Sequence, residues 1–273
     1  MGWTLAITGK GGVGKTTLAA LAVRWLGENG REPVLAVDAD PNTCLDALLG
    51  VKAACTVGGV REEAKQFVQG GMSGGISKQE LLDLKIQEAL VEGEDFDLIA
   101  MGRPEGPGCY CYANNVLRGV LARIAKHYPA VVIDNEAGLE NLSRRTVQNV
   151  DWLVFVTDPS ARGLTTARRL FDLAQEMEIS ASAMGIVVNR MRSLEALERA
   201  QTLFRDTPVH VLGGLPEDDE FAGHDATGKT IFTLPENNAV ARASAEIFAA
   251  ISEPMTAALV ACDERNGTRH GVR

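Results

Sequence analysis

Nine residues near the N-terminus, GKGGVGKTT at 9–17, have the composition and spacing of a loop that binds phosphate. The segment matches G-x-x-x-x-G-K-[ST] and stands between an apolar run at 4–8 and an amphipathic run at 16–28, where a strand and a helix are expected. Its glycines let successive amide N–H groups point at a triphosphate, and the helix N-terminus adds partial positive charge. The residues expected to contact the nucleotide are Gly9, Gly11, Gly12, Val13, Gly14, Lys15, Thr16 and Thr17.

Three side chains of this loop have distinct expected roles. Lys15 should reach the β- and γ-phosphates, and the Thr16 hydroxyl should bind Mg²⁺. The general pattern requires no lysine at Lys10, and a side chain leaving the loop there would point away from its own phosphates. Lys10 is therefore expected to contact a nucleotide held by a second copy of the chain, with a solvated loop lysine as the alternative.

Acidic residues follow two other apolar runs, in the segments VDADPN and VVIDNEAGLE. Ligands of open parallel α/β sheets bind at the carboxyl ends of the strands, so Asp38, Asp40 and Asp134 are expected beside the phosphate loop. Asp134 is, by position, a carboxylate on the Mg²⁺ side. The alternative for Asp38 and Asp40 is that they cap a helix beginning near Thr43.

Two cysteines, Cys109 and Cys111, stand one residue apart in a segment rich in glycine. In an extended segment residues i and i+2 point the same way, about 6–7 Å apart at Cα, so both sulfurs can face one ligand. A two-fold dimer would surround one ion with four thiolates, which suits Zn²⁺ or Ni²⁺. The alternatives for this pair are unreactive structural thiols or a redox-active disulfide, which would be strained. Cys44, Cys55 and Cys262 are expected to be ordinary thiols.

Short apolar runs alternate with longer amphipathic segments through most of the chain. The expected strands are 4–8, 33–38, 97–101, 130–134, 152–157, 185–189 and 209–213. The expected helices are 16–28, 113–126, 163–177, 194–205 and 237–251. Such alternation implies right-handed crossovers and a parallel sheet covered on both faces. The predicted fold class is therefore α/β, a three-layer α/β/α P-loop NTPase fold with a mostly parallel central sheet.

The 273 residues contain no Pro- or Ser-rich linker and no internal repeat, so one P-loop ATPase domain is expected over 1–273. The glycine-rich region of about 50–95 is expected to be mobile, and the polar tail of about 263–273 to be frayed.

Charge and hydropathy exclude several classes of partner. The net charge of −9 argues against sequence-independent nucleic-acid binding, which uses clustered Lys and Arg. No apolar stretch has the length needed to span a bilayer, and no secretory signal is recognisable. Five thinly spread cysteines do not resemble a disulfide framework. We therefore expect a cytoplasmic protein with no nucleic-acid and no membrane partner.

The segment KGGVGKTT resembles the deviant Walker A motif of the family that includes MinD, ParA and nitrogenase iron protein. In that family the extra lysine reaches across a dimer in which two nucleotides are sandwiched, which implies this role for Lys10. The resemblance implies an ATPase whose catalytic residues are Lys10, Lys15 and Asp40. Asp40 would orient the attacking water, and Asp38 would support Mg²⁺.

Three further segments extend this resemblance. VVIDNEAGLE is similar to the Walker B and second-switch segment, in which the Gly138 amide would contact the γ-phosphate. Most relatives read D-T-P-A-G here, so DNEAG departs from the common form and Glu136 has no assigned role. VVNRM resembles the segment whose asparagine recognises adenine in the family, which implies this role for Asn189. The alternative is an asparagine that only forms a turn. GGLPEDDE resembles the loop over the base and contributes Pro216, so ATP is expected rather than GTP.

RPEGPGCYCYANNVLR, DNEAGLENLSRRT and TDPSARGLTTARRL resemble the accessory ATPases that help insert nickel into carbon monoxide dehydrogenase, the CooC type. The resemblance implies a maturation factor that dimerises on nucleotide or metal binding. Its cofactors would be ATP or ADP, Mg²⁺, and Zn²⁺ or Ni²⁺ shared at the dimer interface by Cys109 and Cys111. Its partners would be a second copy of itself and a nickel-dependent carbon monoxide dehydrogenase-like client.

Two other functions of the wider family stay open. A positioning switch of the MinD or ParA kind needs a terminal amphipathic helix or a basic surface, and neither is evident in the sequence. A redox ATPase like nitrogenase iron protein takes its cluster ligands from two separate loops, unlike the CxC pair.

Overall fold

The computed structural model describes residues 2–59, 88–102, 117–119, 121–139 and 150–252 of the chain. The strands are β1 (Trp3–Gly9), β2 (Val34–Asp38), β3 (Leu90–Glu92), β4 (Phe96–Ala100), β5 (Ala130–Asp134), β6 (Val150–Thr157), β7 (Ala181–Met191) and β8 (Val209–Pro216). The helices are α1 (Lys15–Glu28), α2 (Leu45–Leu49), α7 (Ala161–Glu176), α8 (Glu195–Phe204) and α9 (Asp219–Ala226), with 3-10 turns η1 (Ala125–His127) and η2 (Ile231–Thr233). Residues 239–252 are also helical and are called the C-terminal helix below.

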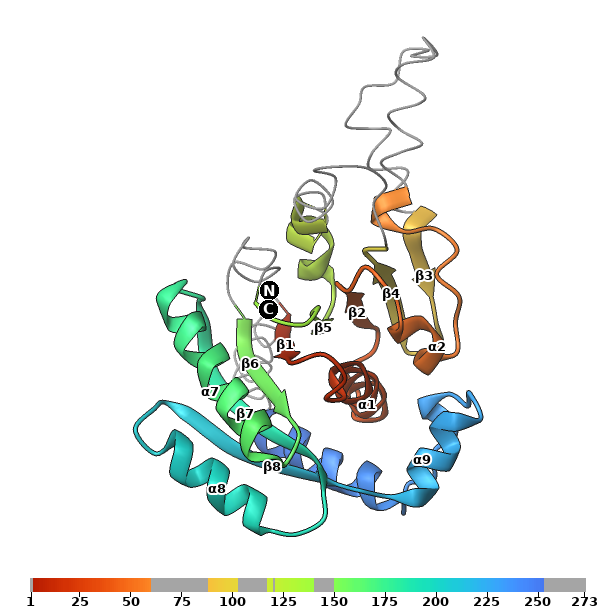
Figure 1. Cartoon of the computed structure of the whole chain (residues 1–273). Coiled ribbons are helices and arrows are strands. Elements are labelled where there is room, and N and C mark those ends of the chain that lie inside the picture. Colours follow the sequence, from red (N-terminus) through yellow and green to blue (C-terminus); the bar gives the residue numbers. More distant parts are fainter. Residues whose placement is uncertain (1, 60–87, 103–116, 120, 140–149, 253–273) are drawn as a thin grey trace, which may run out of the picture.

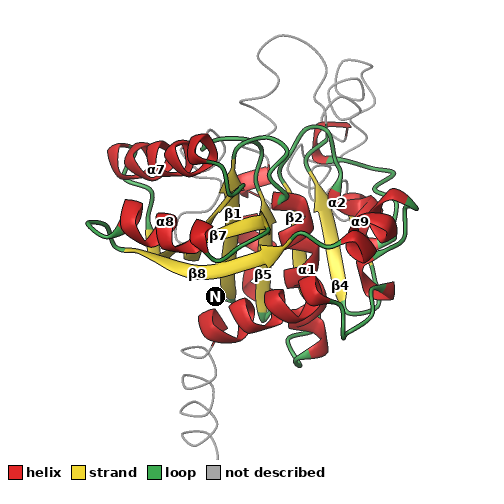
Figure 2. Ribbon diagram, turned by 60° about the horizontal axis from the view of Figure 1, so that its bottom comes forward, coloured by secondary structure: helices red, strands yellow, loops and turns green. Residues whose placement is uncertain are grey.

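One sheet contains all of these strands, in the order β3-β4-β2-β5-β1-β6-β7-β8. Every pairing between the described strands is parallel except that of β3 with β4. Figure 2 shows the strands as one twisted layer between helices. The predicted three-layer α/β/α P-loop NTPase fold with a mostly parallel sheet is confirmed.

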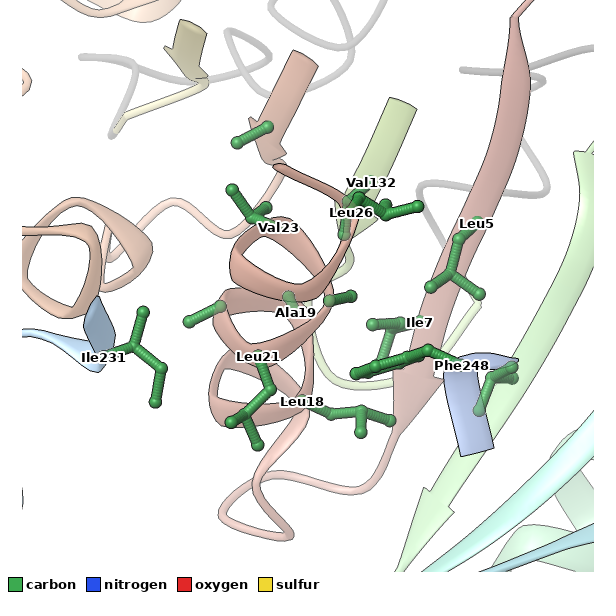
Figure 3. Close-up of a cluster of buried hydrophobic side chains, with 14 of the residues drawn as sticks. Leu5, Ile7, Leu18, Ala19, Leu21, Val23, Leu26, Val132, Ile231 and Phe248 are labelled. Carbon is green, nitrogen blue, oxygen red and sulfur yellow. The ribbon is translucent and has the colours of Figure 1, made fainter. Parts of the chain in front are cut away.

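Helices cover both faces of the sheet. α7 and α8 lie on the opposite side from α1 (Figure 1), and a separate apolar cluster fills each interface. In one of them, α1 packs between β1, η2 and the C-terminal helix (Figure 3). The side chains that meet there include Leu5, Ile7, Leu18, Leu21, Leu26, Ile231 and Phe248. Burial on both faces explains why β1, β2 and β5 read as nearly continuous apolar runs.

All seven predicted strands are present, as are the predicted helices 16–28, 163–177 and 194–205, with shifted ends. The predicted helix 113–126 is helical at 117–119 and 121–124 and ends in η1, and the helix predicted at 237–251 is the C-terminal helix.

α2 is the helix near Thr43 that the capping alternative required, whereas α9, η2 and β3 were not predicted. β3 lies inside the region of about 50–95 that was expected to be mobile. The rest of that region between residues 60 and 87, and the tail at 263–273, lie outside the described residues.

Candidate nucleotide-binding site

The loop GKGGVGKTT leaves the carboxyl end of β1 and enters α1, as the motif predicts. β1 lies between β5 and β6, where the chain's strand order changes direction, so the loop opens at the switch point of the sheet. β5 lies beside β1, and β2 lies beside β5. Asp38 is the last residue of β2 and Asp134 the last residue of β5, and the two are paired in the β2–β5 register. The predicted convergence of these acids beside the loop is therefore present.

Two glycines of the loop are required by close contacts. Gly9 has φ of 155°, and a Cβ there would lie 2.3 Å from the Val156 carbonyl oxygen of β6. Gly14, the residue before α1, has φ of 94°, and a Cβ there would lie 2.2 Å from Nδ2 of Asn189. The loop is thus packed against β6 on one side and β7 on the other, with no room for a larger residue at either point.

Lys15, Thr16 and Asp134 come together under the loop. The Lys15 side chain is buried, and its Nζ donates to the Lys10 carbonyl oxygen at 3.4 Å. A side-chain hydrogen bond joins Thr16 to Asp134, and Lys15 interacts electrostatically with the same carboxylate. Lys10 itself is exposed, as expected for a side chain that points away from its own loop.

Burial dominates the electrostatics of Asp134. It raises the pKa of Asp134 to about 7, with a further rise from neighbouring Asp38 and Asp40 and opposing contributions from Thr16 and Lys15. Its Oδ1 is buried and has no hydrogen-bond partner among the described residues. Such an orphaned carboxylate oxygen beside a threonine hydroxyl is a donor set that Mg²⁺ accepts, so these residues fit the predicted ion.

Asp38 is fully buried and acts as a helix cap. Its Oδ2 accepts from the backbone N–H groups of Cys44 and Leu45 at 2.9 and 3.0 Å, and its Oδ1 accepts from that of Asp40 at 3.0 Å. Burial raises the pKa of Asp38 to about 6 despite these bonds. The capping alternative therefore holds for Asp38, which fixes the start of α2 from the end of β2.

Asp40 has a different environment. Its Oδ1 accepts from the backbone N–H and the side-chain amide of Asn42, at 2.8 and 3.0 Å, and it caps no helix. It is partly exposed and interacts electrostatically with Asp134.

The segment after β5 is bonded to β1. Gly138 donates its N–H to the Gly9 carbonyl oxygen at 3.3 Å, and its own carbonyl accepts from the Thr8 hydroxyl at 2.6 Å. Asn135 donates from its backbone and from its side chain to the Ile7 carbonyl oxygen, at 3.1 and 3.0 Å. The Gly138 amide thus lies at the loop, where it is engaged by a backbone carbonyl.

Asn189 lies in β7 rather than in a turn, and it contacts the phosphate loop. It is 8% exposed, donates from Nδ2 to the Val13 carbonyl oxygen at 2.8 Å and accepts at Oδ1 from the Arg190 N–H at 2.9 Å. Arg190 has φ of 56°, and the β7–β8 register shifts between Val188 and Met191. This irregularity turns Asn189 toward the loop, a contact that sequence reasoning missed.

Pro216 ends β8 and pairs with Met191. The residues that follow Asn189 and Pro216, Arg190 and Glu217, line a cavity of about 390 Å³. Its other lining residues come from the turn before α7, from the connection between β7 and α8, and from α8 itself, among them Asp158, Arg192, Ser193 and Arg199. The two residues predicted to contact the base therefore lie on neighbouring strands beside a cavity.

The predicted thiolate pair, Cys109 and Cys111, lies outside the described residues, as does Cys262. Within the described residues, Cys44 and Cys55 are exposed free thiols, and no group of three or more His, Cys, Asp or Glu is placed to hold a metal ion. No helix in the described part of the chain is long and apolar enough to cross a membrane.

Known proteins are similar in sequence to this chain over most of its length. The chain is 44% identical over 244 residues to an uncharacterized ATP-binding protein of Methanocaldococcus jannaschii, covering 89% of this chain and 96% of the relative. It is 30% identical over 246 residues to the carbon monoxide dehydrogenase accessory protein CooC of Rhodospirillum rubrum, covering 84% of this chain and 89% of CooC.

Among solved structures, the septum site-determining protein MinD of Pyrococcus horikoshii, complexed with Mg-ADP, superposes with a TM-score of 0.67 at 22% identity. That match covers 93% of this chain and 98% of the MinD chain. The family model for the CobQ/CobB/MinD/ParA nucleotide binding domain matches residues 4–231, a span that contains the loop, both carboxylate strands and Asn189. The chain therefore belongs to the CobQ/CobB/MinD/ParA family of nucleotide-binding proteins.

Proposed function

We propose that the protein hydrolyses ATP to ADP and phosphate at the loop between β1 and α1. The observation that carries this proposal is the buried Asp134 oxygen without a partner, beside the Thr16 hydroxyl and Lys15. When bound there, Mg²⁺ would offset charge on the β- and γ-phosphates. Thr16 and Asp134 would hold the ion, with Asp38 behind them as the residue that fixes the start of α2.

The remaining residues of the phosphate side have roles that follow from their placement. The Lys15 ammonium would leave the Lys10 carbonyl for the β- and γ-phosphates, an exchange favoured by the greater charge of the phosphates. The Gly138 N–H would exchange the Gly9 carbonyl for the γ-phosphate. Asp40, which is partly exposed and interacts electrostatically with Asp134, would orient the attacking water. The exposed Lys10 would act on the nucleotide of a second copy, which makes the active form a dimer.

On the base side, Asn189 and Pro216 would contact adenine. The second N–H of the Asn189 amide is available while the first binds Val13, and an amide donor suits a ring nitrogen of the base. This geometry supports a purine base, and the choice of ATP is supported by the similarity to an ATP-binding protein.

We infer further that the protein is a maturation factor for a nickel-dependent carbon monoxide dehydrogenase-like client. The inference is supported by the similarity to CooC over most of both chains and by the CxC pair at Cys109 and Cys111. One Zn²⁺ or Ni²⁺ would be shared by four thiolates of two copies, as cargo held between the subunits of the ATP-dependent dimer.

The experiment is metal analysis of untagged protein, with its mass in solution measured with and without ATP. One ion per two chains supports the shared thiolate site, and the Cys109→Ala, Cys111→Ala variant is the control that should lose the ion. An iron–sulfur absorption spectrum would favour the redox ATPase. An ATP-dependent dimer without metal would favour a positioning switch, the role of the MinD proteins that are 24–27% identical to this chain.

A further inference from the structure

The residues after β8 continue directly into α9, and α9 is weakly anchored. We call residues 216–218 the base-side loop; it contains Pro216 and ends at Asp218, the N-cap of α9. None of the α9 residues is buried, and Phe221 packs only partly against the core. Apolar burial therefore contributes little to where this loop and helix lie, and polar contacts must position them.

The main polar anchor is a single buried amide, Asn238, which stands just before the C-terminal helix. It is 2% exposed, and its Nδ2 donates to Oδ1 of Asp218 at 3.0 Å and to Oε2 of Glu220 at 2.9 Å. Its Oδ1 accepts from the backbone N–H of Val240 at 2.9 Å, which caps the C-terminal helix. Only this orientation of the amide satisfies two carboxylates and a backbone donor at once.

The backbone N–H of Glu217 continues the strand pairing by donating to the Met191 carbonyl oxygen at 2.9 Å. The other side-chain contact of the base-side loop is on the surface. Glu217 pairs with Arg192, whose Nη2 lies 3.0 Å from Oε1, but the Arg192 side chain is 83% exposed. Exposed ion pairs stabilise a geometry only weakly, whereas a buried amide between two carboxylates is strongly directional. Strand pairing thus holds the start of the loop, and Asn238 is the buried side-chain contact that fixes its end at Asp218.

We propose that Asn238 is a positioning residue for ATP, which holds the base-side loop against the adenosine by tying the start of α9 to the start of the C-terminal helix. This proposal rests on the proposed function, because it takes Pro216 to be on the base side. Asn238 would contact no part of the nucleotide. It would act on affinity for the adenosine part and not on the phosphate loop, which belongs to separate elements.

Two substitutions separate this bridging role from helix capping. Asn238→Asp keeps an acceptor for Val240 but removes the donor and places a third carboxylate beside Asp218 and Glu220. Asn238→Ser keeps the cap and a single donor. For Asn238→Asp we expect the Kd for Mg-ATP to rise about tenfold, the Kd for Mg-tripolyphosphate to be unchanged, and the rate at saturating ATP to be retained. Asn238→Ser should give an intermediate Kd for ATP.

Asn29→Ala is the matched control, because Asn29 is an exposed asparagine whose amide donates to the Trp25 carbonyl oxygen at the end of α1. It should bind both ligands as the wild type does. Equal affinity of Asn238→Asp and wild type for ATP would overturn the proposal, and so would equal weakening of ATP and tripolyphosphate. If Asn238→Asp does not fold, Asn238→Ser is subject to the same two outcomes. A wild-type chain that binds tripolyphosphate no less tightly than ATP would instead contradict the proposed function.

Discussion

Gly14 and Asn189 show how two residues far apart in sequence restrict each other. The Asn189 amide occupies the space that any Cβ at Gly14 would need, and it binds the carbonyl of the preceding residue, Val13. The phosphate loop and the base side are thus in direct contact, so a change at one is expected to reach the other.

The first prediction concerns Gly14→Ala. The new methyl would lie 2.2 Å from Asn189 Nδ2 at a residue with φ of 94°, so strain and a clash add together. We expect a loss of roughly 2 kcal/mol or more of unfolding free energy and loss of ATP binding. Gly12→Ala is the control for strain alone, since its φ is 77° but nothing lies within 4 Å of the added atom. Equal loss of stability in both variants, measured by denaturant unfolding, would contradict the contact.

The second prediction concerns Lys10→Ala. Only the backbone carbonyl of Lys10 takes part in the contact with Lys15, and the substitution leaves that group in place. ATP binding to a single chain should therefore persist, while hydrolysis should fall by about 10²-fold or more and ATP should no longer produce a dimer. Isothermal titration and mass measurements test the two parts. A Lys10→Ala chain that is dimeric and active would remove the argument for a cross-subunit lysine.

At the scale of elements, the β2–β5 pair brings two buried carboxyl groups to one sheet edge, and this makes stability depend on pH. Burial raises the pKa of Asp134 to about 7 and that of Asp38 to about 6 from the usual 3.8. A carboxyl group with a higher pKa when folded binds its proton more tightly in the folded state. Its contribution to stability is complete below pH of about 3.8 and is lost as the pH rises through the folded values.

The third prediction is therefore that Asp134→Asn stabilises the protein at pH 8, without nucleotide or metal, and has little effect near pH 4. The amide removes the cost of a buried charge while keeping the shape, and the melting temperature should rise by roughly 3 °C or more at pH 8. Thermal unfolding across this range gives the comparison, with Glu176→Gln on the surface of α7 as control. A difference that is the same at pH 4 and pH 8 would show that burial of charge is not the cause.

The elements differ in how well the sequence predicts them, for a physical reason. β1, β2 and β5 are buried on both faces, so each is a nearly continuous apolar run. α9 buries none of its side chains and so shows no apolar periodicity, and β3 has only three residues. Periodicity reports burial, and elements held by polar contacts or short edge pairing escape it.

The residues of the candidate site also differ in how well the sequence predicts them. Lys15, Thr16 and Asp134 were predictable because a motif and the ends of parallel strands place them together. The Asn189 contact with Val13 joins residues 176 apart and depends on a local irregularity of β7. The Asn238 bridge depends on how α9 meets the C-terminal helix. Neither follows from a local pattern, because both are set by tertiary packing.

At the scale of the whole molecule, the proposed metal and nucleotide sites should respond differently to acid. Thiolates must lose their protons to bind metal, whereas the phosphate loop uses amides and Lys15. The fourth prediction is that Zn²⁺-driven dimerisation weakens as the pH falls from 8 to 6, while ATP-driven dimerisation changes much less. Mass measurement at each pH tests it, and the Cys109→Ala, Cys111→Ala variant should lose only the response to Zn²⁺. Loss of the ATP response in that variant would contradict two independent sites.

The strand order also governs when the protein can first bind a nucleotide during its synthesis. β1 and β2 are not neighbours in the sheet, because β5, which begins at Ala130, lies between them. A nascent chain that ends before β5 already carries the whole phosphate loop, yet Asp134 does not exist and Asp38 has only β4 beside it. Both edges of β1 stay unpaired in such a chain until β5 and β6 emerge, which exposes an apolar strand to chaperones and to aggregation. On the ribosome, the complete site is therefore acquired late, when the second half of the sheet inserts into and extends the first.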